Sequence, residues 1–297
     1  MSGTQVKEDT TELLEGGIYN GILKRHLSEE GILVAEMRSA ILNNEFELYY
    51  QPQNSAENGE LVGFEALVRW KSPTKGVISP ITFIPLAEKS GLINQLGEWV
   101  INESCKHAAN WDDRITVSVN VSAVQITGSD LPNIIRSALR KSGLSAKRLE
   151  LEITESALIV DEAYAVNMFN EIKEIGCSIV MDDFGTGYSS LARLSSYPFD
   201  KIKIDRAFIM KLHDSRSARV IVESAVLIGA SMGMRVLAEG VETKEDFEML
   251  QDLGCHELQG YYFGRPAPYI DVSEVIAADV REKRSSSINL RLVKSSS

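Results

Sequence analysis

The sequence predicts an α/β protein of the TIM-type (β/α)8 barrel class with an antiparallel first strand. From Phe46 onward, short segments rich in β-branched and aromatic residues alternate with longer amphipathic segments, the pattern of a parallel α/β fold. The predicted strands and helical crossovers occupy about 220 residues, close to the usual barrel size of about 250 residues. Only an Asn/Gly-rich loop separates Gln53 from Leu61, too short for a crossover helix. We therefore expect the first two strands to form an antiparallel hairpin.

The elements follow in order along the chain. A first helix is predicted to begin near Leu33, with Met37, Ile41 and Leu42 at helical spacing. The predicted strands span residues 46–53, 61–70, 115–121, 148–154, 178–183, 200–205, 235–239 and 258–263. The predicted helices between them span residues 80–89, 92–111, 130–142, 162–175, 189–194, 215–233 and 244–253.

The chain divides into three parts. Residues 1–33 are polar and weakly patterned, and we expect an N-terminal extension that is partly helical or disordered. Residues 34–270 form the predicted barrel domain. Residues 271–297 are predicted to contain a helix over 272–283 followed by a serine-rich, mobile tail.

The charge balance restricts the partners. The 297 residues contain 31 Lys and Arg against 42 Asp and Glu, a formal net charge of −11. Binding to a nucleic acid polymer without sequence preference needs a basic surface that displaces counterions, so we do not expect a nucleic acid partner. A small anionic ligand remains compatible with this charge, because bound cations can invert the local field.

Cysteine usage and hydropathy indicate a cytoplasmic protein. The three cysteines, Cys105, Cys177 and Cys255, are odd in number and widely spaced, so a disulfide framework is not expected. The histidines lack the spacings typical of zinc sites. No signal peptide is visible, and the longest apolar-leaning run, residues 224–234, is too short to span a membrane.

Polar side chains occur near the ends of the predicted strands. The set comprises Glu65, Asn120, Glu152, Asp182, Asp183, Lys203, Asp205, Glu239 and Gln259. In a barrel, the carboxyl ends of the strands converge on the face that carries the active site. Carboxylates that converge there repel one another and need a cation.

The type of ligand selects the cation. Oxygen ligands without Cys or His favour Mg²⁺ or Mn²⁺, with Ca²⁺ as an inactive substitute. Several carboxylates and an amide exceed what one such ion usually takes from protein. The adjacent Asp182 and Asp183 can share an oxygen between two ions, the arrangement of two-metal phosphoryl hydrolysis.

Each observation has a plainer structural interpretation. A single acid at a strand end is more often a surface group or a helix cap, but a whole set of strand ends in register is poorly explained that way. Glu155 and Glu242 are either helix-start acids favoured by the helix dipole or anchors for loops at the mouth. The Asp183-Phe184-Gly185 string lacks the other kinase motifs, so a kinase is excluded. Gly185 and Gly187 favour a flexible loop over the barrel mouth.

Taken together, the motifs resemble the EAL-domain cyclic di-GMP phosphodiesterase family. The name-giving motif is Glu65-Ala66-Leu67, which is the least specific part by itself. The more specific motifs are Tyr50-Gln51-Pro52, Ser118-Val119-Asn120-Val121-Ser122, Glu152-Ile153-Thr154-Glu155, Asp182-Asp183-Phe184-Gly185-Thr186-Gly187, Lys203-Ile204-Asp205, Ala238-Glu239-Gly240-Val241-Glu242-Thr243 and Gln259-Gly260-Tyr261-Tyr262-Phe263. They occur in the family's order over residues 35–268, nearly the whole predicted domain.

The resemblance implies two Mg²⁺ or Mn²⁺ ions and assigns roles to matching residues. The implied ligands of the first ion are Glu65, Asn120, Glu152 and Asp182, and those of the second are Asp182 and Asp183, with Glu239 and Gln259 acting directly or through water. The implied catalytic residues are Glu65, Lys203 and Glu239, of which Lys203 contacts the nucleophilic water or the phosphate. The implied substrate-binding residues are Gln51, Leu67, Arg69, Asn120, Asp205, Glu242 and Tyr261. Glu155 matches a glutamate that anchors the loop at residues 183–190.

The implied activity is the hydrolysis of cyclic di-GMP to linear pGpG by metal-activated water. Ca²⁺ is expected to allow binding and to inhibit hydrolysis. One alternative is a cyclic di-GMP receptor with negligible turnover, and another is a different metal-dependent barrel enzyme that uses Lys203 as a base. The resemblance is also compatible with a homodimer through the barrel and with a regulatory protein partner, and the residues fix neither.

Overall fold

The computed structural model describes residues 29–155, 157, 162–186, 191–274 and 276. The strands within these residues are β1 (Phe46–Ser55), β2 (Leu61–Ser72), β3 (Gly76–Ile78), β4 (Thr116–Val121), β5 (Leu149–Thr154), β6 (Ser178–Phe184), β7 (Lys201–Ile204), β8 (Arg235–Glu239), β9 (Glu257–Gln259) and β10 (Ala267–Pro268). The helices are α2 (Glu29–Leu42), α3 (Pro80–Ser90), α4 (Ile93–Ala108), α5 (Ala123–Gly128), α6 (Leu131–Ser142), α7 (Glu162–Ile175), α8 (Leu191–Ser196), α9 (Arg206–Ile209), α10 (Arg216–Met232) and α11 (Lys244–Asp252), with a 3₁₀ turn at Ala146–Arg148.

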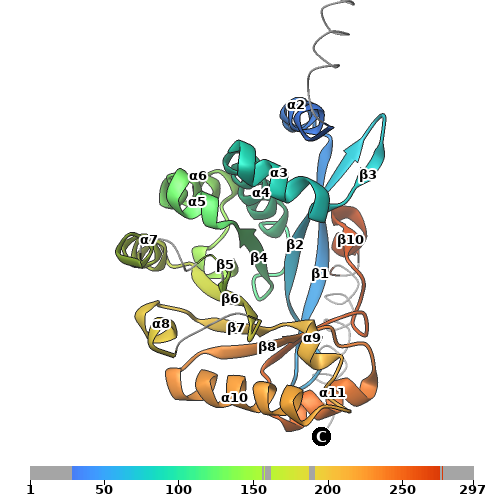
Figure 1. Cartoon of the computed structure of the whole chain (residues 1–297), viewed down its shortest axis with the longest axis vertical. Coiled ribbons are helices and arrows are strands. Elements are labelled where there is room, and N and C mark those ends of the chain that lie inside the picture. The colour runs from blue at the N-terminus through green and yellow to red at the C-terminus, as the bar shows by residue number, and fades with distance from the viewer. Residues whose placement is uncertain (1–28, 156, 158–161, 187–190, 275, 277–297) are drawn as a thin grey trace, which may run out of the picture.

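The described strands form a closed barrel. They pair in the order β1-β9-β8-β7-β6-β5-β4-β2, and β2 pairs back with β1, while helices surround the strands (Figure 1). β1 runs antiparallel to both β2 and β9, and the pairs from β2 through β4 to β9 are parallel. The predicted (β/α)8 barrel with an antiparallel first strand is therefore confirmed.

The strand register brings the polar strand ends together. Gln51 on β1 lies opposite Glu65 on β2. Asn120 on β4 lies opposite Glu152 on β5, and Glu239 on β8 lies opposite Gln259 on β9. The pairs on β4–β5 and β8–β9 lie at the carboxyl ends of parallel strands, which meet at one end of the barrel. Glu65 joins them there, because Asn120 and Gln259 both donate hydrogen bonds to its carboxylate.

Local sequence signals fix the helix boundaries. α5 and α11 begin with capping boxes, in which the side chains of Ser122 and Thr243 accept hydrogen bonds from the first turn. α6 and α10 end at Gly143 and Gly233, which adopt left-handed conformations with φ of 74° and 70°. A residue without a Cβ adopts this conformation at no steric cost, so the helices stop there.

Two predicted elements were too long. The helix predicted over 92–111 ends at Ala108, because the chain then turns and Trp111 packs its ring on Tyr50, with centroids 5.1 Å apart. The last strand, predicted over 258–263, stops at Gln259. A Cβ on Gly260 would lie 2.0 Å from the Val241 carbonyl oxygen, and the chain turns after this close approach.

The prediction missed β3, β10, α5 and α9, which are all short. α8 is described from Leu191, and the first two residues of its predicted range, 189–190, lie outside the described residues. Residues 269–274 and 276 are helical, and the remainder of the helix predicted over 272–283 lies outside the described residues, as do residues 1–28, the C-terminal tail and residues 187–190 of the predicted mouth loop. Among the described helices, none combines the length and the apolar character that crossing a membrane would require.

Candidate active site

The carboxylates at the strand ends converge on the ammonium group of Lys203 on β7. The Nζ atom lies 2.6 Å from Glu239 Oε1, 2.8 Å from Glu152 Oε2, 3.4 Å from Asp182 Oδ1 and 3.6 Å from Glu65 Oε2. The side chain of Lys203 is 1% exposed. Burial alone would lower the pKa of Lys203, but these four carboxylates hold the pKa well above its ordinary value. The group is therefore held as a cation.

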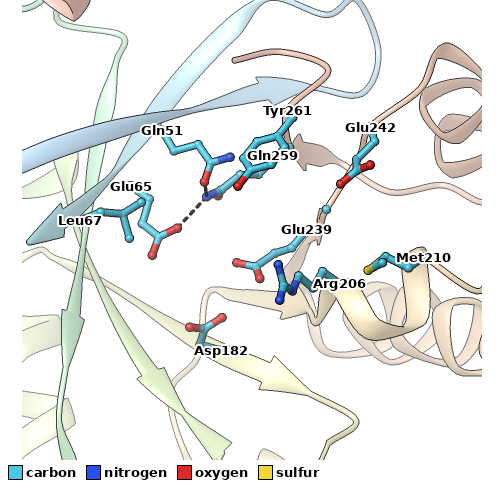
Figure 2. Close-up of a pocket in the computed structure, with 12 residues that line it drawn as sticks. Gln51, Glu65, Leu67, Asp182, Arg206, Met210, Glu239, Glu242, Gln259 and Tyr261 are labelled. Carbon is cyan, nitrogen blue, oxygen red and sulfur yellow. Dashed lines mark hydrogen bonds between the residues drawn. The ribbon is translucent and has the colours of Figure 1, made fainter. Parts of the chain in front are cut away.

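Amide side chains fix the orientation of Glu65 on β2. Asn120 Nδ2 donates to Glu65 Oε1 at 2.7 Å, and Gln259 Nε2 donates to Glu65 Oε2 at 2.6 Å. Gln259 Nε2 also donates to Gln51 Oε1 at 3.2 Å (Figure 2). Gln259 Oε1 accepts from Gln53 Nε2 at 3.1 Å. Burial alone would raise the pKa of Glu65, but Lys203 and the hydrogen bonds from Gln259 and Asn120 lower it. Glu65 is thus held as an ionised carboxylate.

Glu152 and Glu239 are less well compensated. Glu152 is 1% exposed, and its Oε1 atom is buried without a hydrogen-bond partner among the described residues. Burial raises the pKa of Glu152 well above its ordinary value, and the charges of Glu65 and Asp182 add to this effect against the opposing charge of Lys203. Burial, together with Asp182 and Glu65, raises the pKa of Glu239 to about 8 despite its contact with Lys203. One ammonium shared among four carboxylates does not satisfy all of them.

The end of β6 carries backbone strain. Asp183 has a φ of 57°, in the left-handed region that residues with a Cβ rarely adopt. Its N–H donates to Asp182 Oδ1 at 3.0 Å. Burial raises the pKa of Asp183, and the charges of Asp182 and Asp205 raise it further. Strained residues of this kind cluster at functional sites.

The chemistry of this cluster fits divalent cations. Among the described residues, no three His, Cys, Asp or Glu side chains are already arranged to coordinate a metal ion. The carboxylates contact the ammonium group of Lys203 instead. The donor atoms are nevertheless all oxygen, and Glu152 Oε1 has no partner among the described residues. When ionised, the five carboxylates leave four negative charges uncompensated by Lys203. Two divalent ions would balance that charge. The carboxylates are Glu65, Glu152, Asp182, Asp183 and Glu239.

A pocket opens above this cluster. It has a volume of about 210 Å³, and Figure 2 shows Glu65, Asp182 and Glu239 facing into it. Of the predicted substrate-binding residues, those that line the pocket are Gln51, Leu67, Glu242 and Tyr261. The lining also includes Gln259, Arg206, Met210, Gly240 and Gly260.

The other predicted site residues lie outside this lining. Asp205 caps α9, where its Oδ1 atom accepts from the Ala207 N–H at 2.9 Å. Arg69 is partly buried, and its NH1 atom donates to the Val68 carbonyl at 3.0 Å. Glu155 follows β5 and is buried, and its Oε2 atom has no hydrogen-bond partner among the described residues. Its predicted loop-anchoring role stays a prediction, because residues 187–190 of that loop lie outside the described residues.

Sequence reasoning missed four pocket residues and one supporting residue. Arg206, Met210, Gly240 and Gly260 line the pocket, and Gln53 orients Gln259. Arg206 directly follows Asp205 at the end of a predicted strand, so the rule that identified the other strand-end residues would have found it.

Comparison with known proteins identifies the family. A family model described as the EAL domain matches residues 34–266. A signaling protein of Caulobacter vibrioides, itself uncharacterized, is 46% identical over 256 residues, which make up 85% of this chain and 32% of the relative. MucR of Pseudomonas aeruginosa, named a bifunctional diguanylate cyclase/cyclic di-GMP phosphodiesterase, is 40% identical over 255 residues, which make up 84% of this chain and 37% of MucR. The chain thus spans about a third of the length of these curated relatives.

Solved structures agree with this result. A structure described as PaMucR phosphodiesterase in complex with c-di-GMP has a TM-score of 0.77 and 40% identity, with 81% of this chain and 99% of that chain covered. The EAL enzyme Bd1971, in a form bound to cAMP and cyclic di-GMP, has a TM-score of 0.80 and 31% identity, with 93% of this chain and 77% of that chain covered. The resemblance drawn from the sequence motifs is confirmed, and the chain belongs to the EAL-domain family.

Proposed function

We propose that this chain hydrolyses cyclic di-GMP to linear pGpG. The observation that carries the proposal is the convergence of four carboxylates on Lys203 beneath an open pocket, at the barrel face where such folds carry their active sites. The relatives named above as cyclic di-GMP phosphodiesterases, or solved with cyclic di-GMP, suggest the substrate.

Two hard divalent ions, Mg²⁺ or Mn²⁺, are proposed as cofactors. Glu65, Asn120, Glu152 and Asp182 would hold one ion, and Asp182, Asp183, Glu239 and Gln259 would hold the other. When bound, such ions supply Lewis acidity that lowers the pKa of water and offsets charge on a phosphoryl group.

The reaction adds water across one phosphodiester bond. The water oxygen attacks phosphorus in line, the bond from phosphorus to the 3′ oxygen breaks, and that oxygen takes up a proton as the ring opens. Lys203, fixed as a cation beneath the pocket, offsets the negative charge that develops on the phosphoryl oxygens. Glu239 lies beside it at 2.6 Å with a 20% exposed side chain, and we assign it to orient the attacking water. Gln259 and Asn120 keep Glu65 in place.

The test is a turnover assay with purified protein. Cyclic di-GMP is incubated with Mg²⁺ or Mn²⁺, and pGpG is separated by chromatography, with a chelator as the metal-free control. Glu65→Gln keeps the shape of the side chain but removes its charge, and should reduce the rate by roughly 100-fold or more. Glu57→Gln, an exposed glutamate between β1 and β2, is the matched control and should retain full activity.

The same assay distinguishes the receptor alternative. Tight binding of cyclic di-GMP by calorimetry without pGpG formation, under every metal tested, would contradict the proposed hydrolysis and favour a binding module. Absence of both binding and turnover would direct attention to a different metal-dependent barrel reaction.

A further inference from the structure

The pocket has an uneven distribution of charge. Four carboxylates line it, and among its described lining residues the only positively charged side chain is Arg206. Lys203 lies below the lining, and its charge is already shared among four carboxylates. An anionic ligand that enters this pocket therefore finds one side chain able to offer it an uncommitted positive charge. The lining carboxylates are Glu65, Asp182, Glu239 and Glu242.

Arg206 is exposed to solvent at the pocket. It is the first residue of α9, directly after the N-cap Asp205. In the part of the chain that the structure describes, its guanidinium group takes part in no hydrogen bond or ion pair. Figure 2 shows the side chain on the α9 side of the pocket, near Glu239 and away from Gln51.

The backbone holds Arg206 at a fixed place beside the active-site cluster. Gly240, which follows Glu239, has a φ of 79°, and a Cβ on this residue would lie 2.6 Å from the Cβ of Arg206. The glycine thus allows the loop after β8 to pack directly against Arg206. Met210, the C-cap residue directly after α9, also lines the pocket, so this segment presents a cation and an apolar side chain.

Two nearby arginines, Arg69 and Arg265, lie outside the pocket lining. The guanidinium group of Arg69 donates to the Val68 carbonyl and lies 5.5 Å from the Tyr49 ring centroid. The guanidinium group of Arg265 lies 4.0 Å from the Tyr261 ring centroid. Neither arginine lines the pocket.

We propose that Arg206 binds the second phosphate of the cyclic dinucleotide, the one that is not cleaved in that step. This inference rests on the proposed function. A cyclic dinucleotide carries two phosphates on opposite sides of one ring, so a phosphate placed over the carboxylate cluster leaves the other at the rim of the pocket. That second phosphate lies among repelling carboxylates and needs a cation of its own. A guanidinium group, with its paired N–H donors, matches phosphate oxygens in geometry and charge.

The test compares two substrates. Arg206→Ala should raise the KM for cyclic di-GMP by about 10-fold or more, the usual effect of losing a hydrogen bond to a charged group. The loss in kcat/KM should be at least about 10-fold larger for cyclic di-GMP than for bis(p-nitrophenyl) phosphate, which has a single phosphate. Arg206→Lys should restore part of the affinity, because it keeps the charge. Arg216→Ala is the matched control, since it removes an exposed arginine from the first residue of α10, outside the pocket.

The outcomes are distinguishable. An active wild-type protein whose KM is unchanged by Arg206→Ala would overturn the role of Arg206 while leaving the proposed function intact. Equal losses on both substrates would also overturn it, because they would indicate a general effect on the active site. A wild-type protein that neither binds nor hydrolyses cyclic di-GMP would overturn the proposed function and this inference together. If Arg206→Ala instead weakens the binding of cyclic di-GMP but not that of cyclic di-AMP, Arg206 recognises the guanine base, and the phosphate assignment is wrong.

Discussion

Replacing Lys201 with methionine should destabilise the fold far more than replacing a lysine in an exposed ion pair. Lys201 lies inside the barrel, 3% exposed, and its Nζ atom is 2.7 Å from both Glu150 Oε2 and Glu257 Oε2. Ser118 Oγ donates to Glu150 at 2.8 Å, and Arg235 pairs with Glu257 at 2.9 Å from the surface. The group is neutral as a whole, with two carboxylates and two cations.

The variant leaves one buried negative charge uncompensated. Glu150 would keep only the hydroxyl of Ser118, while Glu257 would keep Arg235. Removing one partner of a buried ion pair typically costs about 3–5 kcal/mol. For a chain of this size, that corresponds to a drop in Tm of roughly 6–20 °C. Lys71→Met removes the partner of Glu47 from a pair whose side chains are 50% and 34% exposed, and should cost less than about 1 kcal/mol.

The pH dependence gives a second, independent readout. Burial alone would raise the pKa of Glu150, but Lys201 lowers it, so this pairing stabilises the wild type at neutral pH and the stabilisation is lost as pH falls through the lowered pKa. In Lys201→Met the carboxyl group is buried without its cation, and its pKa rises. Protonation of Glu150 then removes the uncompensated buried charge from the variant. The difference in unfolding free energy between wild type and Lys201→Met should therefore shrink as pH is lowered from 7 toward 4.

The assay is urea unfolding followed by circular dichroism at several pH values. The double variant Lys201→Met/Glu150→Gln restores neutrality and should recover at least half of the lost free energy of unfolding. A loss no larger than that of Lys71→Met would refute the reasoning. So would a loss that is independent of pH, or a double variant less stable than the single one, because both would place the cost in packing rather than in charge.

Three further results are expected. Gly260→Ala should lower the free energy of unfolding by about 1–3 kcal/mol in a denaturant titration, because the new Cβ would collide with the Val241 carbonyl. Gly128→Ala is the control, since its Cβ would meet only the Asn94 side chain, and equal losses in the two variants would contradict the argument. Asp246→Asn should lower the free energy of unfolding by about 1 kcal/mol at pH 7, because Asp246 closes the capping box of α11. Burial alone would raise the pKa of Asp246, but hydrogen bonds, led by that with His213, lower it. The stability difference from wild type should therefore vanish as pH falls through that pKa, and a difference that persists at pH 3 would contradict this. Replacing Mg²⁺ with Ca²⁺ should preserve calorimetric binding of cyclic di-GMP while suppressing pGpG formation, and rapid turnover in Ca²⁺ alone would contradict the two-ion proposal.

The barrel could be predicted because its signals are local and repeated. Each strand of the parallel part carries its own apolar run, and the short loop after Gln53 by itself requires a hairpin. The same regularity predicted the site, since a polar residue at the end of a buried strand has one direction in which to point. Glu65, Glu152 and Asp182 were therefore expected near one another, and the structure places all three within 3.6 Å of Lys203 Nζ.

What could not be predicted depends on contacts between distant segments. β9 ends where Gly260 meets Val241, and no property of the sequence around Gly260 reveals that approach. The partnership of Lys201 with Glu257 joins strands 56 positions apart in the chain. Short elements such as α9 contain too few residues for a periodic pattern. The sequence therefore did not predict that Met210, which follows α9, lines the pocket.

The two lysines of β7 explain why one cluster is structural and the other is suited to chemistry. Residues two apart on a strand face the same side, so Lys201 and Lys203 both point into the barrel, at successive levels. Glu150 on β5 and Glu257 on β9 contact Lys201. Glu152 on β5 contacts Lys203, and Gln259 on β9 joins that cluster through its hydrogen bond to Glu65. Both levels are buried, so burial does not distinguish them. The level of Lys201 is neutral, whereas that of Lys203 has excess negative charge and an opening above it. An uncompensated charge that ligands can reach is what allows cations and a phosphate to bind at the level of Lys203. The balanced charge around Lys201 creates no such demand one level below.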